Sequence, residues 1–165
     1  MSLTQPFILE IQQEMISTRK MLERVPAAAF NWKPHEKSTP LGVLASHVAN
    51  LPGMLTTILT QDELDFAGGN FVPPMPESTA ELVERFDRNV ERGLKLLQEH
   101  SDEQMQKNWR LRQGEHVLFE LPRTGVIRSM LINHLIHHRG QLSVYLRLLD
   151  VPLPSVYGPT ADEQF

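Results

Sequence analysis

The sequence predicts an all-α protein: a four-helix bundle with a short extended or hairpin insert before its last helix. Four long segments place apolar residues every three or four positions, as one face of an amphipathic helix does. Segments rich in glycine and proline separate some of them, and one stretch after residue 108 alternates instead between apolar and polar residues. Helices of about 20 residues connected in this way typically pack as a bundle.

The first helix is expected from Gln5 to Arg24, because its apolar positions recur at helical spacing and Pro26 ends it. These positions are Phe7, Ile8, Ile11, Met15, Leu22 and Val25. Residues 27–40 break the period and are interpreted as a loop with Trp32 and Pro34 as packing points.

A second helix is expected after Ser38 or Thr39, either of which can cap it, with Pro40 in its first position. Its apolar stripe comprises Leu41, Leu44, Val48, Leu51, Leu55 and Ile58. Pro52 lies inside this stripe and removes one backbone hydrogen bond, so the helix should bend there.

The segment DFAGGNFVPPMPES, residues 65–78, is the clearest linker. A third helix follows it, because Ser78 and Glu81 have the spacing of a capping box. The stripe of this helix comprises Leu82, Phe86, Val90, Leu94 and Leu97. Partial alternation on both sides of Gln113 and Gly114 then predicts a short hairpin or an extended excursion.

The last helix is expected from about Gly125 to about Leu149, and the tail after it contains too much proline and glycine to continue it. A length of 165 residues suits one hydrophobic core, so a single domain spanning residues 1–165 is expected.

Composition excludes several classes of protein. The net charge is −4 and no block of lysine and arginine occurs, so nucleic acid is not an expected partner. The chain contains no cysteine, which excludes disulfide scaffolds, thiolate zinc clusters and cysteine nucleophiles. No secretory leader pattern and no apolar stretch of membrane-spanning length appears, so we expect a cytoplasmic location and no membrane partner.

The segment INHLIHHRGQL, residues 132–142, carries three histidines. His134 and His138 are four residues apart, so they lie about 40° apart on one helix face. That face is the predicted core stripe, which comprises Ile127, Leu131, His134, His138, Leu142, Tyr145 and Leu149. Imidazoles inside a core need hydrogen bonds or a metal ion to replace their lost hydration. The spacing allows both rings to reach one ion, as in HExxH helices, although the glutamate of that motif is absent.

His47 is the expected third ligand, because it is the only other histidine inside a predicted core helix. His137 lies at the margin of the stripe, where it could face a neighbouring helix, a partner subunit or the metal, and a His134–His137 pair also fits the spacing. Gln141 lies about 20° from His134 around the helix and is the better candidate, ahead of Arg139, for a hydrogen bond to a ligating ring.

Three neutral imidazoles favour zinc or nickel, then iron or copper, over magnesium or calcium. They leave a coordination position for water or substrate, which is typical of a catalytic site. The first hypothesis is therefore an enzyme that activates water or a low-molecular-weight thiol for attack on a small electrophile. No residue is a convincing general base, since Glu115 and Glu120 lie in the expected hairpin. The alternative is a non-catalytic protein, binding or structural, in which the ion ties two helices together.

Two blocks of the sequence resemble the DinB superfamily of DinB/YfiT-like metalloenzymes. They are RVPAAAFNWKPHEKSTPLGVLASHVANL at residues 24–51 and NHLIHHRGQLSVYLRLLDVPLPSVYGP at residues 133–159, together with the LPR segment at 121–123. The resemblance implies an up-down-down-up four-helix bundle, often a homodimer, with one divalent metal held by three histidines. Matched residue by residue, the ligands fall on His47, His134 and His138. Similar members are described as metal-dependent hydrolases, and relatives include thiol-dependent S-transferases and an isomerase. A small-molecule substrate and a low-molecular-weight thiol cosubstrate are therefore expected.

Overall fold

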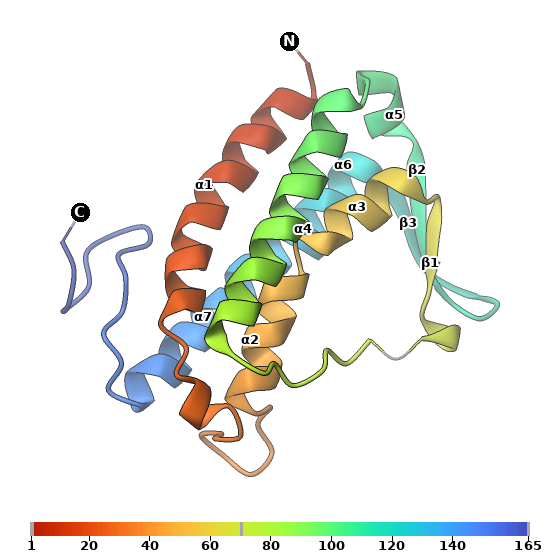
Figure 1. Ribbon diagram of the computed structural model, residues 1–165. Coiled ribbons are helices and arrows are strands. Elements are labelled where there is room, and N and C mark those ends of the chain that lie inside the picture. The colour runs from red at the N-terminus through yellow and green to blue at the C-terminus, as the bar shows by residue number, and fades with distance from the viewer. Residues whose placement is uncertain (1, 70, 165) are drawn as a thin grey trace.

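The longer helices run alongside one another and make up most of the molecule (Figure 1). The computed structural model describes residues 2–69 and 71–164. The long helices are α1 (Thr4–Glu23), α2 (Leu41–Asn50), α3 (Gly53–Thr60), α4 (Thr79–Glu99) and α7 (His134–Leu148). Helix α4 contacts α1, α2 and α3, while α7 contacts α1 and α2. These contacts place α2 and α7 side by side, which positions the site described below.

The bend predicted at Pro52 is confirmed. Helix α2 ends at Asn50 and α3 begins at Gly53, with the two helices bent by 41°. Because proline has no N–H to continue the ladder, the chain turns here, and the Met54 amide bonds to the Leu51 carbonyl at 2.9 Å. Within the described residues no single helix is long and apolar enough to cross a membrane, although α2 and α3 taken together meet the length and composition criteria.

The expected cap of the second helix is wrong. Neither Ser38 nor Thr39 caps α2, which begins at Leu41 directly after Pro40. Instead, the Leu41 amide donates to the Trp32 carbonyl at 2.8 Å and the Gly42 amide donates to the Phe30 carbonyl at 2.9 Å. The short 3₁₀ turn η1 (Ala27–Ala29) and the loop after it therefore satisfy the helix start through backbone contacts.

A small three-stranded sheet corrects the all-α prediction. Strands β2 (Asn108–Gln113) and β3 (His116–Pro122) form the predicted hairpin, and its turn contains Gly114 with a positive φ of 61°. Strand β1 (Glu63–Asp65) pairs in parallel with β2 and was not predicted. Arg112 holds β1 in place, because its guanidinium contacts Glu63 at 2.7 Å and Asp65 at 2.6 Å. The sheet order is β1-β2-β3.

The linker and the N-terminus of the third predicted helix, α4, largely agree with the prediction. The linker at 65–78 contains only the 3₁₀ turn η2 (Phe66–Gly68), and its residue 70 lies outside the described residues. The Ser78 side chain accepts from the Glu81 amide at 3.1 Å, which is one half of a capping box. The Glu81 carboxylate accepts from Glu77 rather than from Ser78, and a complete capping box occurs instead at Ser101 in the short helix α5 (Asp102–Gln106).

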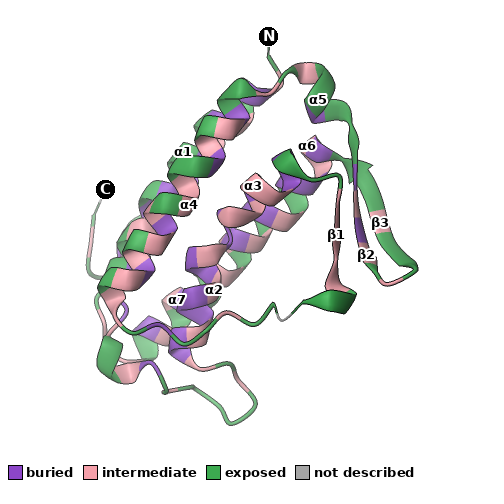
Figure 2. Cartoon of the chain, turned by 45° about the vertical axis from the view of Figure 1, so that its right-hand side comes forward, coloured by how far each residue is buried: buried purple, intermediate pink, exposed green. Residues whose placement is uncertain are grey.

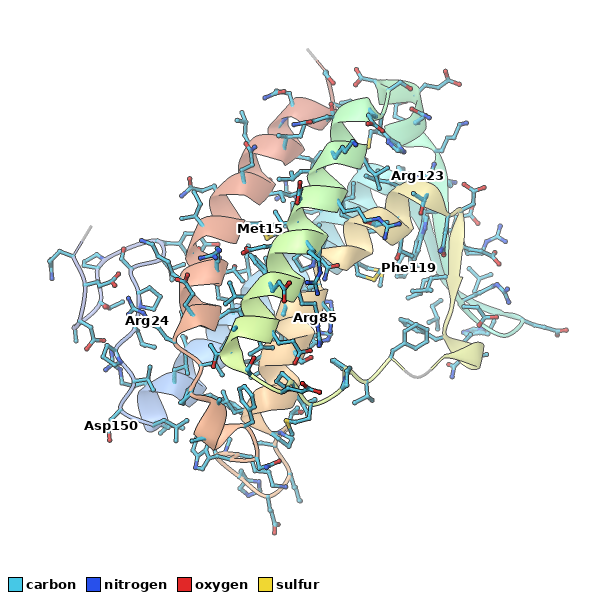
Figure 3. All side chains as sticks on the ribbon, viewed as in Figure 1. Met15, Arg24, Arg85, Phe119, Arg123 and Asp150 are labelled. Atoms are coloured by element: carbon cyan, nitrogen blue, oxygen red, sulfur yellow. The ribbon has the colours of Figure 1, made fainter. Side chains whose placement is uncertain are left out.

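The last helical segment consists of three parts rather than one regular helix. It comprises α6 (Arg123–Val126), the π-helical segment η3 (Ile127–Asn133) and α7. Arg123, almost fully buried, anchors its start by donating to the Ile58 carbonyl at 2.8 Å and to Asp62 at 2.8 Å (Figure 3). A π turn is wider than an α turn, so η3 changes which face of α7 meets the core.

Buried residues line the faces that the helices turn towards one another, while the outer faces of α1, α4 and the hairpin are exposed (Figure 2). The chain after α7 runs back alongside α1 (Figure 1). Arg24 at the end of α1 holds it, because its guanidinium donates to the Pro152 carbonyl at 2.9 Å and pairs with Glu163 (Figure 3).

Candidate metal centre

Three histidines from two neighbouring helices come together at the contact between α2 and α7. His47 lies in α2, His134 begins α7, and His138 follows one turn later. The ring centroids are 4.5 to 5.0 Å apart, and one nitrogen of each ring lies within 4.8 Å of the others. These three residues, called the histidine cluster below, are the set that the sequence predicts.

The spacing within the histidine cluster fits a shared cation. The Nε2 atoms of His47 and His134 are 3.3 Å apart. Two ring nitrogens bound to one tetrahedral ion at about 2.0–2.1 Å would stand about 3.3 Å from each other. Two lone pairs that face each other at this distance repel, so the arrangement needs a proton or a cation between them.

Burial keeps the rings of the cluster neutral. Loss of hydration, together with the neighbouring rings of His138 and His134, lowers the pKa of His47 to about 4. Burial likewise lowers the pKa of His134 and of His138. All three imidazoles are therefore uncharged at neutral pH, and in this state one nitrogen of each ring can donate its lone pair to a metal.

Hydrogen bonds orient two of the three rings. The Nδ1 atom of His138 lies 2.7 Å from Oε1 of Gln141, and because that amide oxygen only accepts, Nδ1 carries the proton and Nε2 keeps its lone pair. The ring of His134 forms a hydrogen bond with the backbone of Met130, which lies in the π-helical segment η3. The sequence places Gln141 near His134, whereas the structure brings its side chain to the ring of His138.

His137 is not part of the cluster. Its side chain is exposed, and its ring lies 4.9 Å from that of His138 at a steep angle. The alternative pair of His134 and His137 is therefore not the one that the fold brings together with His47.

Two pockets meet at the histidine cluster. The polar pocket, of about 720 Å³, is bordered by Lys37, Ser38, Gln141 and Tyr145 together with His47 and His138. The apolar pocket, of about 430 Å³, is bordered by leucine, methionine and phenylalanine side chains together with His47 and His134. Residues 71–73 of the linker border both pockets. Every ring of the cluster therefore reaches a cavity of the size that small ligands occupy.

Comparison with known proteins shows the family of the chain. The model of the DinB family matches residues 1–164. The chain belongs to the DinB family. It is 24% identical over 161 residues to the uncharacterized protein YrdA of Bacillus subtilis, covering 95% of this chain and 89% of the relative.

Two crystal structures of DinB-like proteins share the fold. One, from Bacillus cereus, has a TM-score of 0.72 and 25% identity, with 92% of this chain and 95% of the other covered. The other, YjoA of Bacillus subtilis, has a TM-score of 0.69 and 16% identity, with 92% and 96% covered. The mostly helical DinB-like fold is thus established.

The position of the cluster in this DinB protein differs from the prediction in one respect. His134 and His138 lie half-buried at the edge of the core, not inside it. The buried positions of α7 are Leu135, Arg139, Leu142 and Leu146. The π-helical segment η3 contains more residues per turn than an α-helix. Positions counted from Ile127 at α-helical spacing therefore no longer face the core in α7, and His134 and His138 face the pockets instead.

Arg139 has a role that does not involve the cluster. It is 3% exposed and pairs with Glu14 of α1 at 2.7 Å, and it also donates to Ser17 at 2.8 Å. The Tyr157 hydroxyl lies 2.8 Å from Arg139 and donates to Glu14. This buried network joins α1, α7 and the C-terminal segment.

Several residues of the pockets escaped the sequence analysis. Met130, Lys37 and Phe71 all border the site, but none lies on a predicted stripe. The one available signal was apolar: the linker contains Phe71 and Val72, which are large side chains for an unpacked connection.

Proposed function

We propose that the histidine cluster holds one divalent transition metal and that this centre catalyses a reaction of a small molecule. The observation that carries the proposal is the convergence of three neutral ring nitrogens at the junction of two pockets. Among the described residues, the cluster comprises three histidines and no carboxylate or fourth histidine. Three protein ligands facing a cavity are typical of catalytic rather than structural sites.

The donor set suits zinc or nickel best, and iron or copper next, because these ions accept imidazole readily. When bound, such an ion supplies Lewis acidity that lowers the pKa of a coordinated water or thiol and polarises a carbonyl. Among the residues that the structure describes, no aspartate or glutamate borders either pocket. A site without a carboxylate base favours a nucleophile that the ion itself makes acidic.

Two reaction classes fit this chemistry. In hydrolysis, water adds its oxygen to an electrophilic carbon, the bond to the leaving group breaks, and that group departs with the electron pair and takes up one proton. In thiol transfer, the sulfur of a low-molecular-weight thiol forms the new bond, and the thiol proton leaves with the displaced group. The residues of the chain would bind the ion, fix the His138 tautomer through Gln141 and hold the substrate in the pockets.

We also propose the finer architecture that supports this site. Figure 1 supports an up-down-down-up four-helix bundle, because α1 and α7 descend while α2, α3 and α4 ascend. A single domain, a homodimer and a cytoplasmic location stay predictions.

Cobalt substitution tests the proposed centre. Untagged protein is freed of metal, titrated with Co²⁺ and followed by visible absorption, with azide and then a small thiol added as exogenous ligands. We expect one Co²⁺ per chain and a spectrum that both ligands change, because a position is open to them. His47→Ala and His138→Ala should remove the spectrum, whereas His137→Ala, the matched control in the same helix, should keep it.

Two results would count against the proposal. Unchanged Co²⁺ binding in both alanine variants would show that the ligands lie elsewhere. A spectrum that neither azide nor thiol alters would indicate a closed ion that ties α2 to α7, which is the non-catalytic alternative.

A further inference from the structure

The two pockets that meet at the histidine cluster differ in chemistry. The apolar pocket is bordered by Leu51, Met54, Leu64, Phe66, Phe71 and Met130, and besides the histidines only Asn50 and Thr57 add polar side chains. The polar pocket is bordered by Lys37, by hydroxyl groups and by the Gln141 amide, and also by apolar side chains such as Val43, Leu44 and Val144. A ligand that spans the cluster would therefore meet mostly apolar surface at one end, and at the other a mixed surface whose polar groups include the Lys37 ammonium.

The apolar pocket has a wall that the sequence builds for it. The Phe71 ring packs against the Phe66 ring with centroids 4.6 Å apart. Gly69 permits this, because a Cβ at that position would lie 2.6 Å from the Phe71 ring. Further along, Met75 seats on Gly42 of α2, where a Cβ would lie 2.5 Å from its sulfur. The linker thus packs on itself through Phe66 and Phe71, and on α2 through Met75 and Gly42.

The polar pocket carries positive charge without a compensating acid. Lys37 is its only charged residue, and among the described residues no carboxylate pairs with that lysine. The loop that bears Lys37 is held to α7, because the Tyr145 hydroxyl donates to the Thr39 carbonyl at 3.2 Å and the Tyr145 ring packs edge-on against Trp32.

We propose that the substrate is an amphipathic anion, whose apolar body fills the apolar pocket, whose negatively charged end lies in the polar pocket near Lys37, and whose electrophilic atom lies between them at the histidine cluster. This inference rests on the proposed function for the location of the reacting atom. The binding of the two ends rests on the pockets alone, and it can be measured without metal and without turnover.

Monoalkyl succinates are suitable probes, because each carries a carboxylate at one end, an ester carbon in the middle and an alkyl chain at the other end. The monomethyl, monobutyl and monohexyl esters are titrated into metal-free protein by calorimetry at low salt. We expect affinity to rise roughly threefold for each methylene that enters the apolar pocket. The neutral hexyl ester of succinamic acid should bind about tenfold more weakly than monohexyl succinate.

Variants separate the two ends. Lys37→Glu should weaken all three esters by about the same factor, roughly tenfold at low salt, while Lys33→Glu, in the same loop but outside the pocket, should change binding less than twofold. Met54→Trp should abolish the dependence on chain length, and Leu148→Trp, at an exposed site, should preserve it. If Met54→Trp unfolds, Leu64→Glu tests the same pocket with a charge.

Equal affinity for all chain lengths, equal affinity for the neutral ester, or an unchanged affinity in Lys37→Glu would overturn the inference. A Co²⁺ titration of a second portion of the same metal-free protein distinguishes the two failures. Wild-type protein that binds one metal but shows none of these ligand preferences contradicts the substrate class alone, whereas protein that binds no metal contradicts the proposed centre.

Discussion

At the scale of single residues, the histidine cluster is governed by burial and by two hydrogen bonds. Burial of the ring is the largest cause that lowers the pKa of His47, which falls to about 4. For His138 the hydrogen bond with Gln141 opposes the effect of burial, and for His134 the bond to the Met130 backbone does the same. The rings therefore stay neutral and fixed in orientation, which prepares them to bind a cation.

The lowered pKa values predict how the stability of metal-free protein depends on pH. An unfolded histidine takes up a proton near pH 6.5, whereas folded His47 resists it until about pH 4. Unfolding therefore takes up protons in this window, and the free energy of unfolding should fall as the pH drops from 6.5 towards 4. Above pH 6.5 this contribution is constant.

Urea unfolding of the wild type and His47→Gln at several pH values measures this effect. The variant should lose less stability across the window, by on the order of 1 kcal/mol, because the ring is half-buried and water screens part of the cost. Carboxylates titrate in both proteins, so the difference isolates the histidine. Parallel pH dependences would show that burial does not control the protonation of His47.

The Gln141 contact predicts a graded effect on metal affinity. Gln141→Leu removes the acceptor for the His138 Nδ1 proton, so the ring loses its fixed tautomer, and affinity for Zn²⁺ should fall about tenfold or more. Gln141→Glu keeps an acceptor at the same position and should retain most of the affinity. Competition with a chromophoric chelator measures both. Equal losses in the two variants would mean that the hydrogen bond does not support the ligand.

At the scale of elements, the π-helical segment η3 connects the anchored start at Arg123 with the ligand-bearing helix α7. Its wide turns place Met130 both against His134 and at the edge of the apolar pocket. Short π segments frequently occur at functional sites, because they reorient the side chains that follow them. The phase of α7, and with it the direction of two ligands, depends on this segment.

Deletion of Ser129, an exposed residue of η3, tests that dependence. Removing one residue lets the segment relax to an α-helix, in which the Met130 carbonyl accepts from the His134 amide and is no longer free for the His134 ring. We expect Zn²⁺ affinity to fall at least tenfold while circular dichroism shows the helices retained. Ser129→Ala keeps the chain length, removes only the side-chain bonds to the Gly125 and Val126 carbonyls, and serves as the control. A deletion variant with wild-type affinity would contradict the role of η3.

At the scale of the whole molecule, one buried network joins its distant parts. Arg139 in α7 and Glu14 in α1 are buried, and they share charge-assisted hydrogen bonds with each other and with the hydroxyl of the exposed Tyr157 in the C-terminal segment. Breaking a buried pair from one side leaves an uncompensated charge, which costs more than removing both partners. The network therefore constrains how α1, α7 and the C-terminal segment fit together.

Replacement of Arg139 tests this constraint. Arg139→Met should lower the free energy of unfolding by about 3–5 kcal/mol, because the buried Glu14 carboxylate loses its cationic partner. The double variant Glu14→Leu, Arg139→Met should recover part of that loss. Urea unfolding at pH 7 measures both, and a double variant that is no more stable than Arg139→Met would show that the loss comes from packing rather than from charge.

Local chemistry explains which features the sequence predicts. Proline fixes its own backbone, so the bend at Pro52 is visible in the sequence, and so is the i, i+4 pair of His134 and His138. Strand β1 is only three residues long and depends on partners near Arg112, about fifty residues away. No local pattern reveals such a pairing.

The sequence also does not predict how deeply the histidine ligands are buried or which loop residues border the pockets. The π-helical segment η3 has no known composition signature, so counting 100° per residue from Ile127 placed His134 and His138 inside the core rather than at its edge. Lys37 and Phe71 come to the site through loops held by Tyr145 and Phe66. Contacts of this kind follow from tertiary packing rather than from periodicity.

Anomalous diffraction from crystals of zinc-loaded protein tests the central claim most directly. We expect one zinc peak per chain, about 2.0–2.1 Å from a ring nitrogen of each of His47, His134 and His138, with no fourth protein ligand. A peak bound by other residues, a fourth protein ligand, or no zinc at the histidine cluster would contradict it.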